Sequence, residues 1–509
     1  MLEYAGIREH AEAELRALQK TEEVHVKDYS QALSEISCRI WDYAELKFDE
    51  VKSAEEIAAL LEAEGFSVSR GIAGMETAFS ASWGTGSPVI GFLGEYDALS
   101  GLSQEAGLSE KKPVPKQECG HGCGHNLLGS AAAGAALMLR DYLKENGKQG
   151  TVLFFGCPGE EGGSGKAYMA RAGVFDSLDA ALTWHPGGGN AVMTGSMMAN
   201  CQVYYRFHGR SSHAAAAPHL GRSALDAVEL MDVGVNYMRE HMEPTDRIHY
   251  AVLDTGGTSP NVVQNHAEVL YLIRSTDAEK VRALYERVNR IAQGAAMMTE
   301  TEVEIIFDKA CSSTLSNAVL EDVLYRSMQR IPLPEYTEEE LAFVKAVKDT
   351  YSDLDPSSDL SISFLPNREK RLYAKRFRES LMADFIVEHH HLDVNVAGSS
   401  DVGDVSQTVP TAQFVAATAA PGTPGHSWQM VSQGKSGTAL KGMLYAAAVL
   451  ADAGKQLVED PPLLAKAKEE FAEETGGQKY QCPIPDYIQP HRNVKELEEM
   501  LKKNSSAGR

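Results

Sequence analysis

The chain has 509 residues, of which 43% are hydrophobic, and a formal net charge of −23. This length predicts two domains, one inserted into the other, and the acidic charge argues against nucleic acid or an anionic membrane as a partner. No transmembrane run or signal peptide is recognisable, and the seven scattered cysteines fit a reducing compartment, so we expect a cytoplasmic protein.

The first 190 or so residues alternate between helical and strand-like segments. Helices are expected over residues 2–20, 24–47, 51–64, 124–145 and 165–171, and strands over 66–69, 77–83, 88–93, 151–156 and 180–184. This alternation indicates an α/β sheet. Ligands of such sheets bind beyond the carboxyl ends of the strands, and three of these ends deliver Asp97, the pair Glu160 and Glu161, and His185.

The pattern changes near residue 200. Strands are expected over 201–209, 247–254, 268–275 and 302–307, and helices over 220–242 and 277–299. The order βαββαβ predicts a ferredoxin-like inserted domain. We therefore divide the chain into a first part of the main domain (1–199), an inserted domain (200–313) and a second part of the main domain (314–509).

The last part begins with an expected helix over 316–330. Residues 333–392 are charged and rich in Pro and Ser, with helices expected over 337–352 and 368–387, and the sequence assigns them no role. A strand over 411–417 and an Ala-rich helix over 434–453 complete the pattern.

The segment Gly120–Asn126 places Cys123 and His125 two positions apart between glycines, directly before a helix. Cys and His are preferred ligands of Zn²⁺ and similar ions, and glycine lets the backbone turn so that both side chains point the same way. The alternative is a glycine-rich turn with a buried Cys and a capping His. His121 and Cys119 are left outside the candidate site.

Glu160 and Glu161 follow a buried strand and are flanked by glycines. A two-metal hydrolytic site needs a bridging ligand, terminal ligands and one carboxylate that acts as general base. Adjacent glutamates can supply both a ligand and a base, although such a pair is more often a solvated surface. The candidate ligands are Cys123, His125, Glu160, Glu161, His185 and His426.

His213 lies in the sequence Gly209-Arg210-Ser211-Ser212-His213 of the inserted domain. It could donate a hydrogen bond to the oxyanion of a tetrahedral intermediate if it reaches the site. The alternative is a loop histidine that follows a strand.

Several motifs together resemble a known family. They are Gly94–Leu99 (GEYDAL), His121–Asn126 (HGCGHN), Pro158–Gly162 (PGEEG), His185-Pro186, Gly209–Ala215 (GRSSHAA) and Pro424–His426 (PGH). Their order is that of the aminoacylase/glutamate carboxypeptidase family of co-catalytic metallopeptidases, in its amidohydrolase branch. Residues 123–127 (CGHNL) and 398–406 resemble the B-subunit group of the p-aminobenzoyl-glutamate hydrolases most closely. The resemblance covers residues 30–455.

The resemblance implies a mixed-sheet co-catalytic metallopeptidase domain with an inserted lid and dimerisation domain. It implies two divalent metal ions per subunit, Zn²⁺ or Mn²⁺ with Co²⁺ as a further candidate. The implied ligands are Cys123 as the bridge, His125, Glu161, His185 and His426.

The same resemblance assigns roles to residues around the metals. Glu160 would be the general base, Asp97 would orient a ligand histidine, and His213 would reach the neighbouring subunit's active site. Asn261 and Arg274 would hold the carboxylate of the substrate. Ser100, where the family has Pro, and the long segment 333–392 depart from the family pattern.

The implied reaction is hydrolysis of the amide bond of an N-acyl or N-aroyl amino acid, p-aminobenzoyl-glutamate-like. The alternatives are a dipeptidase acting on small unusual dipeptides and a partner-dependent substrate-binding subunit. The implied partners are a small-molecule amino-acid conjugate and either a second copy, through the lid domain, or a homologous subunit. No nucleic acid or membrane partner is expected.

Overall fold

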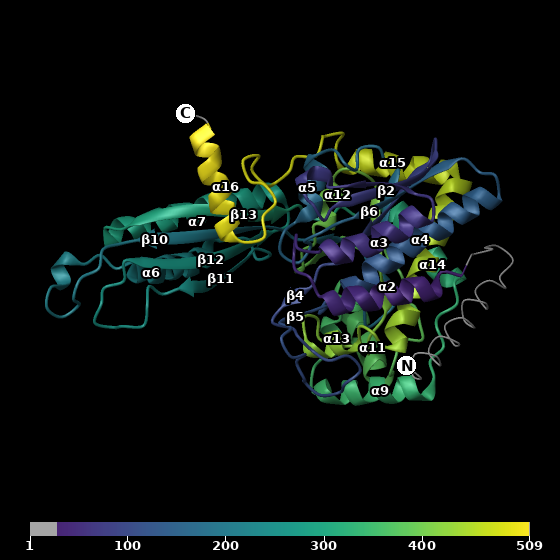
Figure 1. Ribbon diagram of the computed structural model, residues 1–509, viewed down its shortest axis with the longest axis horizontal. Helices are drawn as coiled ribbons and strands as arrows, with labels where there is room; N and C mark the ends of the chain where they lie inside the picture. Colours follow the sequence, from purple (N-terminus) through teal and green to yellow (C-terminus); the bar gives the residue numbers. More distant parts are fainter. Residues whose placement is uncertain (1–27, 508–509) are drawn as a thin grey trace. The chain divides into compact units, whose positions relative to one another are not determined.

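The computed structural model describes residues 28–507 in two compact units (Figure 1). The helix expected over 2–20 lies outside the described residues. The first unit comprises Met1–Ser196, Leu315–Val396 and Val405–Tyr480, and the second comprises Met197–Thr314, Ala397–Asp404 and Gln481–Arg509. The division made from the sequence placed the last two of these segments in the main domain.

A seven-stranded sheet forms the centre of the first unit. In spatial order its strands are β1 (Ser67–Arg70), β2 (Phe79–Thr85), β6 (Gly150–Gly156), β3 (Val89–Gly94), β7 (Ala180–Gly187), β15 (Thr411–Ala417) and β8 (Ala191–Val192). The four strands β6, β3, β7 and β15 are parallel, whereas β1, β2 and β8 pair antiparallel with their neighbours. The predicted α/β class with a mixed sheet is confirmed.

The first unit also contains helices, most of which pack on this sheet or on one another, as Figure 1 shows for α2, α3 and α4. They are α2 (Ser30–Tyr43), α3 (Val51–Ala63), α4 (His125–Glu145), α5 (Gly165–Arg171), α8 (Ala318–Arg330), α9 (Glu338–Lys348), α10 (Leu360–Ser363), α11 (Asn367–Glu379), α13 (Trp428–Gln433), α14 (Gly437–Glu459) and α15 (Pro461–Glu474). Small residues let α2, α4 and α14 approach closely, because a Cβ at Gly134 would lie 2.7 Å from Leu33 and 3.2 Å from Ala447.

The helix expected over 368–387 is too long, because α11 ends at Glu379. The following backbone is extended and is held by Asn190. The Asn190 side chain donates to the carbonyls of Ala383 and Phe385 at 2.9 and 3.1 Å, and its backbone carbonyl accepts from the Val387 amide at 2.8 Å. These hydrogen bonds take the place of helical ones, and a partner so distant in sequence leaves no local signal.

The second unit has the element order βαββαβ that the sequence predicted. Its elements are β10 (Ala199–His208), α6 (Ala224–Met238), β11 (Arg247–Asp254), β12 (His266–Ser275), α7 (Ala278–Thr299) and β13 (Glu302–Cys311). The strands form an antiparallel sheet in the order β11-β12-β10-β13, and both helices pack against it. The roles of this unit as lid and dimerisation domain stay predictions.

The C-terminal segment of the second unit includes α16 (Val494–Ala507). The His491 ring lies 2.7 Å from the Asp308 carboxylate of β13, and Glu498 pairs with Arg206 of β10 at 2.6 Å. Leu497 is fully buried. This segment is therefore an integral part of the unit (Figure 1).

No helix within residues 28–507 is long and apolar enough to cross a membrane.

Candidate functional site

Four of the candidate ligands, together with Asp97, lie on or after neighbouring parallel strands, whereas Cys123 and His125 lie where α4 begins. Strands β6, β3, β7 and β15 are adjacent, so their carboxyl ends lie at one edge of the sheet. Asp97 follows β3, Glu160 and Glu161 follow β6, and His426 lies in the segment after β15. His185 belongs to β7 itself, which runs to Gly187 and so extends beyond the predicted end at residue 184.

The loop before α4 depends on two glycines. Gly124 precedes the helix in a left-handed conformation with φ of 78°, and a Cβ there would lie 2.9 Å from Pro186. At Gly122 a Cβ would lie 2.5 Å from Leu102 and 3.3 Å from the Cα of His426. The absence of these side chains lets the loop with Cys123 lie close to the segments that carry His185 and His426.

His125 is fully buried and is oriented by Asp97. Its Nδ1 lies 2.9 Å from Oδ1 of Asp97, while the other carboxylate oxygen of Asp97 accepts the Glu161 amide at 2.8 Å. A proton on Nδ1 leaves the Nε2 lone pair of His125 available to a metal ion. Asp97 therefore holds both a candidate ligand and the turn that carries Glu161.

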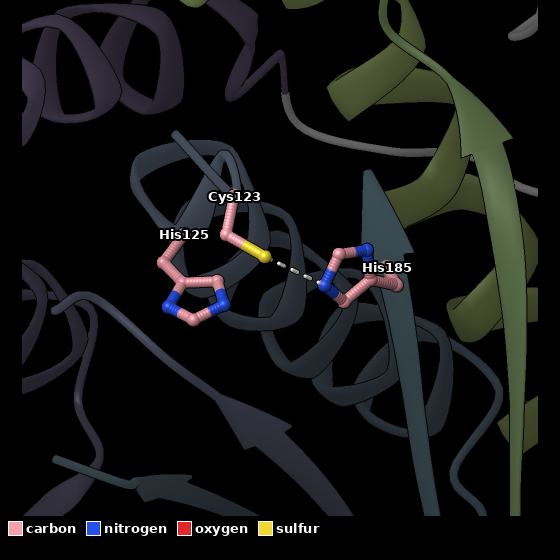
Figure 2. A group of neighbouring side chains, drawn as sticks. All are labelled: Cys123, His125 and His185. Atoms are coloured by element: carbon pink, nitrogen blue, oxygen red, sulfur yellow. Dashed lines mark hydrogen bonds between the residues drawn. The ribbon is translucent and has the colours of Figure 1, made fainter. Parts of the chain in front are cut away.

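Cys123 is shared by two groups of candidate ligands. Its Sγ lies 3.3 Å from Nε2 of His185, and Figure 2 shows the thiol directed at that ring with His125 close by. One group is Cys123, His125 and His185, and the other is Cys123, Glu161 and His426; within each, the ligand atoms lie within 4.8 Å of one another. Nδ1 of His185 donates to the Pro186 carbonyl at 2.7 Å, which leaves Nε2 as the acceptor.

The carboxylates of the site lie in a water-poor environment. Burial raises the pKa of Glu161 to about 8 and also raises the pKa of Glu160. Burial raises the pKa of the Cys123 thiol as well. A cation between these groups would oppose this effect by stabilising their ionised forms.

Two buried polar atoms of this set fit a metal site. Nε2 of His125, which faces the Glu95 carboxylate at 3.2 Å, and Oε1 of Glu161 make no hydrogen bond among residues 28–507. Nε2 of His426 lies 3.5 Å from the other carboxylate oxygen of Glu161. Such unsatisfied atoms are costly in a protein interior unless a ligand pairs with them, so the donor set fits divalent cations that accept N, O and S ligands.

Three predicted site residues lie in the second unit. Nδ1 of His213 accepts hydrogen bonds from the amides of Ala215 and Ala216 at 3.2 and 3.1 Å, so Nε2 carries the proton and can act as a donor. The Asn261 carbonyl accepts from the Ala214 amide at 2.9 Å, which joins the two loops. Both His213 and Asn261 are exposed.

Arg274, the third of these residues, lies on β12 and is partly buried. Its Nη1 donates to the Ser399 hydroxyl at 2.8 Å, and within the part of the chain that the structure describes its buried Nε has no partner. Burial lowers the pKa of this guanidinium. The unsatisfied donor makes Arg274 suited to an anionic group.

Three residues around the site were not assigned a role from the sequence. Glu95 lies 3.2 Å from Nε2 of His125 and 2.6 Å from the fully buried Lys166 ammonium. The Glu50 carboxylate accepts from the Gly159 amide at 2.8 Å and so fixes the turn before Glu160. The motif around Glu95 was a usable signal, whereas Lys166 and Glu50 resemble ordinary surface residues in the sequence.

His121, which was left outside the site, is buried and lies with Nε2 3.0 Å from the carbonyl of Ile40. Burial lowers its pKa to about 4, so the ring is neutral at pH 7. It joins the loop to α2 and is not part of either ligand group.

Comparison with protein families gives a match over most of the chain. The profile described as "Peptidase family M20/M25/M40" matches residues 91–486. The B-subunit of a p-aminobenzoyl-glutamate hydrolase from Escherichia coli K12 is 48% identical over 461 residues, which cover 90% of this chain and 96% of that protein.

Two further similarities are more distant. An Xaa-Arg dipeptidase from Mus musculus is 31% identical over 305 residues, which cover 58% of this chain and 66% of that protein. The crystal structure of a dinuclear metal-binding M20 peptidase from Bacillus subtilis has a TM-score of 0.52 at 18% identity and covers 85% of this chain and 99% of that chain. The latter is a similarity of fold.

Proposed function

Because the chain belongs to peptidase family M20/M25/M40, we propose that it is a metal-dependent amidohydrolase. Its substrate would be an N-acyl or N-aroyl amino acid of the p-aminobenzoyl-glutamate type, whose amide bond it cleaves. The observation that supports this most is that Cys123 belongs to both ligand groups while Glu160 lies beside the site. The name of the Escherichia coli relative supports the substrate class.

The proposed metal ligands are those of the two groups. Cys123 would be shared by both ions, His125 and His185 would hold one of them, and Glu161 and His426 would hold the other. These ligands suit Zn²⁺, Mn²⁺ or Co²⁺. When bound, two such ions would activate water and polarise the scissile carbonyl.

Glu160 is the proposed general base and acid. Its carboxylate takes a proton from the attacking water and then delivers it to the amide nitrogen, so that the C–N bond breaks and the free amine leaves. Burial raises the pKa of Glu160 above its usual range, and a bound cation would oppose this shift and favour the carboxylate that accepts the proton. Asp97 keeps His125 in the tautomer that presents Nε2.

The second unit supplies the proposed substrate-binding groups. Arg274 and Asn261 would bind the substrate carboxylate, and Nε2–H of His213 would donate to the oxyanion in the active site of the neighbouring subunit. The unsatisfied Nε of Arg274 and the tautomer of His213 support these roles.

Two alternative functions remain distinct hypotheses. A dipeptidase activity is supported by the Xaa-Arg dipeptidase relative. A chain that needs a homologous partner for activity is supported by the designation of the Escherichia coli relative as a B-subunit. We propose a homodimer through the second unit or a heteromer with a homologous subunit, in the cytoplasm.

The test is hydrolysis by the full chain supplied with Zn²⁺ or Mn²⁺. p-Aminobenzoyl-glutamate, other acyl amino acids and Xaa-Arg dipeptides are offered in parallel, and released amino acids are measured by mass spectrometry. We expect release of glutamate or a related amino acid. Cleavage of only the dipeptides would favour the dipeptidase, and activity that appears only after a homologous subunit is added would favour the heteromer.

Glu160→Gln is the decisive variant. We expect it to retain its metal content and to lose about a hundredfold to ten-thousandfold in kcat, because only the proton transfer is removed. Glu110→Gln, in an exposed loop, is the control. Near-normal turnover by Glu160→Gln would contradict the assignment of the base.

A further inference from the structure

A second cluster of metal-ligating side chains lies in the first unit and is not used by the proposed reaction. Glu321 and Asp322 belong to α8, and His389 and His391 belong to the extended segment that follows α11. Glu321, His389 and His391 present ligand atoms that lie within 4.8 Å of one another.

The contacts in this cluster converge on one oxygen of Glu321. Oε2 of Glu321 lies 3.3 Å from Nδ1 of His391 and 3.5 Å from Nε2 of His389. The side chains of Glu321 and His389 are each only 3% exposed, whereas that of His391 is 47% exposed. Two of the three side chains in the cluster are therefore buried, and the side formed by His391 is open to water.

The other nitrogen of His391 faces a separate carboxylate. Its Nε2 lies 3.2 Å from Oδ1 of Asp322. Nδ1 of His391 makes a hydrogen bond with Oε2 of Glu321 at 3.3 Å. A proton held on Nε2 by Asp322 would instead free Nδ1 to bind a metal ion. In many metal sites a carboxylate accepts the proton on one ring nitrogen of a histidine, which leaves the other ring nitrogen free to bind the metal. Asp322 is placed to do this for His391.

His389 supplies the third potential ligand atom of the cluster. Nε2 of His389 is buried and makes no hydrogen bond within residues 28–507. The Glu321 carboxylate is itself held by hydrogen bonds with the side chains of Thr194, His391 and Ser316. Three potential ligand atoms thus surround one position.

We propose that Glu321, His389 and His391 bind a divalent transition-metal ion, with Asp322 as the residue that orients His391. Ligand bonds of about 2.0–2.1 Å at tetrahedral angles separate ligand atoms by about 3.3 Å, which is close to the distances of 3.3 and 3.5 Å around Oε2 of Glu321. Imidazole with carboxylate suits Zn²⁺ and Co²⁺. Water completes the open side, and the ion links α8 to the segment after α11.

The first test is the zinc content of the full chain in buffered free Zn²⁺, measured by inductively coupled plasma mass spectrometry. We expect Glu321→Gln and His391→Gln each to hold one Zn²⁺ fewer per chain than the unchanged protein. His390→Gln is the matched control, because His390 is also half-exposed but faces Glu369 at 3.7 Å. Equal zinc in all four proteins, or the same loss in His390→Gln, would overturn the proposal.

The second test needs no variant and so does not depend on the folding of one. Diethyl pyrocarbonate modifies accessible histidines of the unchanged, metal-depleted chain, and peptide mass spectrometry reports each site. We expect Zn²⁺ to reduce modification of His391 several-fold and to leave His390 unaffected. Failure of Zn²⁺ to protect His391 would refute the site.

Discussion

At the scale of single residues, Asp97 connects the two ligand groups. Each of its oxygens accepts one hydrogen bond, from His125 and from the Glu161 amide. Both bonds require an acceptor. An amide at this position can offer only one acceptor, so its NH₂ group must face one of the two donors.

We therefore expect Asp97→Asn to reduce metal affinity by about 10–100-fold. Competition with a chelator of known affinity measures this change. Asp353→Asn, at an exposed position, is the control and should bind metal as the unchanged chain does. Unaltered affinity in Asp97→Asn would show that Asp97 does not orient His125.

Glu50 permits a prediction about pH at the same scale. Burial, and to a lesser extent the neighbouring Asp97, raises the pKa of this carboxyl from 4.5 to about 8. The folded chain therefore binds this proton more tightly than the unfolded chain. The associated stability is present below pH 4.5 and is lost as the pH rises to about 8.

In Glu50→Gln the amide can still accept from Gly159 and donate to the Thr77 hydroxyl. We expect this variant to gain stability relative to the unchanged chain as the pH rises from 5 to 8, by up to about 4 kcal/mol. Urea unfolding at several pH values measures the difference. A difference that is independent of pH would mean that Glu50 is ionised in the folded protein.

At the scale of elements, the turn into α4 sets the position of Cys123. Gly124 combines a positive φ with a close approach to Pro186, the neighbour of His185. Gly86 has a similar φ of 85° but nothing within 4 Å of an added Cβ. A comparison of alanine substitutions at the two glycines therefore separates the effect of backbone strain from the effect of steric contact.

We expect Gly124→Ala to lower the free energy of unfolding by about 1–3 kcal/mol and to weaken metal binding. Gly86→Ala should show only the backbone part, about 1 kcal/mol, and no change in metal content. Chemical unfolding and metal analysis of both variants test this. Equal behaviour of the two would mean that the contact with Pro186 relaxes without consequence.

At the scale of the whole molecule, the C-terminal segment completes the second unit. Leu497 of α16 is fully buried, and the same segment provides His491 against Asp308. Removal of a buried leucine side chain leaves a cavity. This cavity should lower the free energy of unfolding of the second unit, which contains the segment.

We expect Leu497→Ala to destabilise the second unit by about 2–5 kcal/mol and to leave the first unit unchanged. Calorimetry, together with hydrogen exchange of β10 and β13, distinguishes the two units. Lys495→Ala, at an exposed position on the same helix, is the control. A loss of protection in the first unit would contradict the separate stability of the units.

Much of the fold could be predicted from local patterns. The apolar run over 151–156 and the small-residue run after His125 carry their own periodicity, and β6 and α4 lie where these patterns indicate. The prediction that the helix continues beyond Glu379 was wrong, because the backbone after Glu379 is held by hydrogen bonds with Asn190, a residue far away in the sequence.

The candidate site divides in the same way. Cys123, Glu160 and Glu161 could be singled out from the sequence. Cys123 lies in a glycine-rich loop before a helix, and Glu160 and Glu161 follow a buried strand. Lys166 could not be found, since a lysine gives no sign that it will be buried against Glu95.

The sequence by itself thus determined the α/β class and the βαββαβ order of the second unit, and it singled out Cys123, His125, Glu160, Glu161, His185 and His426 as candidate ligands. Only the tertiary structure decided that β6, β3, β7 and β15 are neighbours and that Cys123 is common to two ligand groups. It also decided that Glu321 meets His389 and His391. The physical reason is that periodicity and turn chemistry act between near neighbours, whereas strand order and the burial of charge depend on contacts between distant segments.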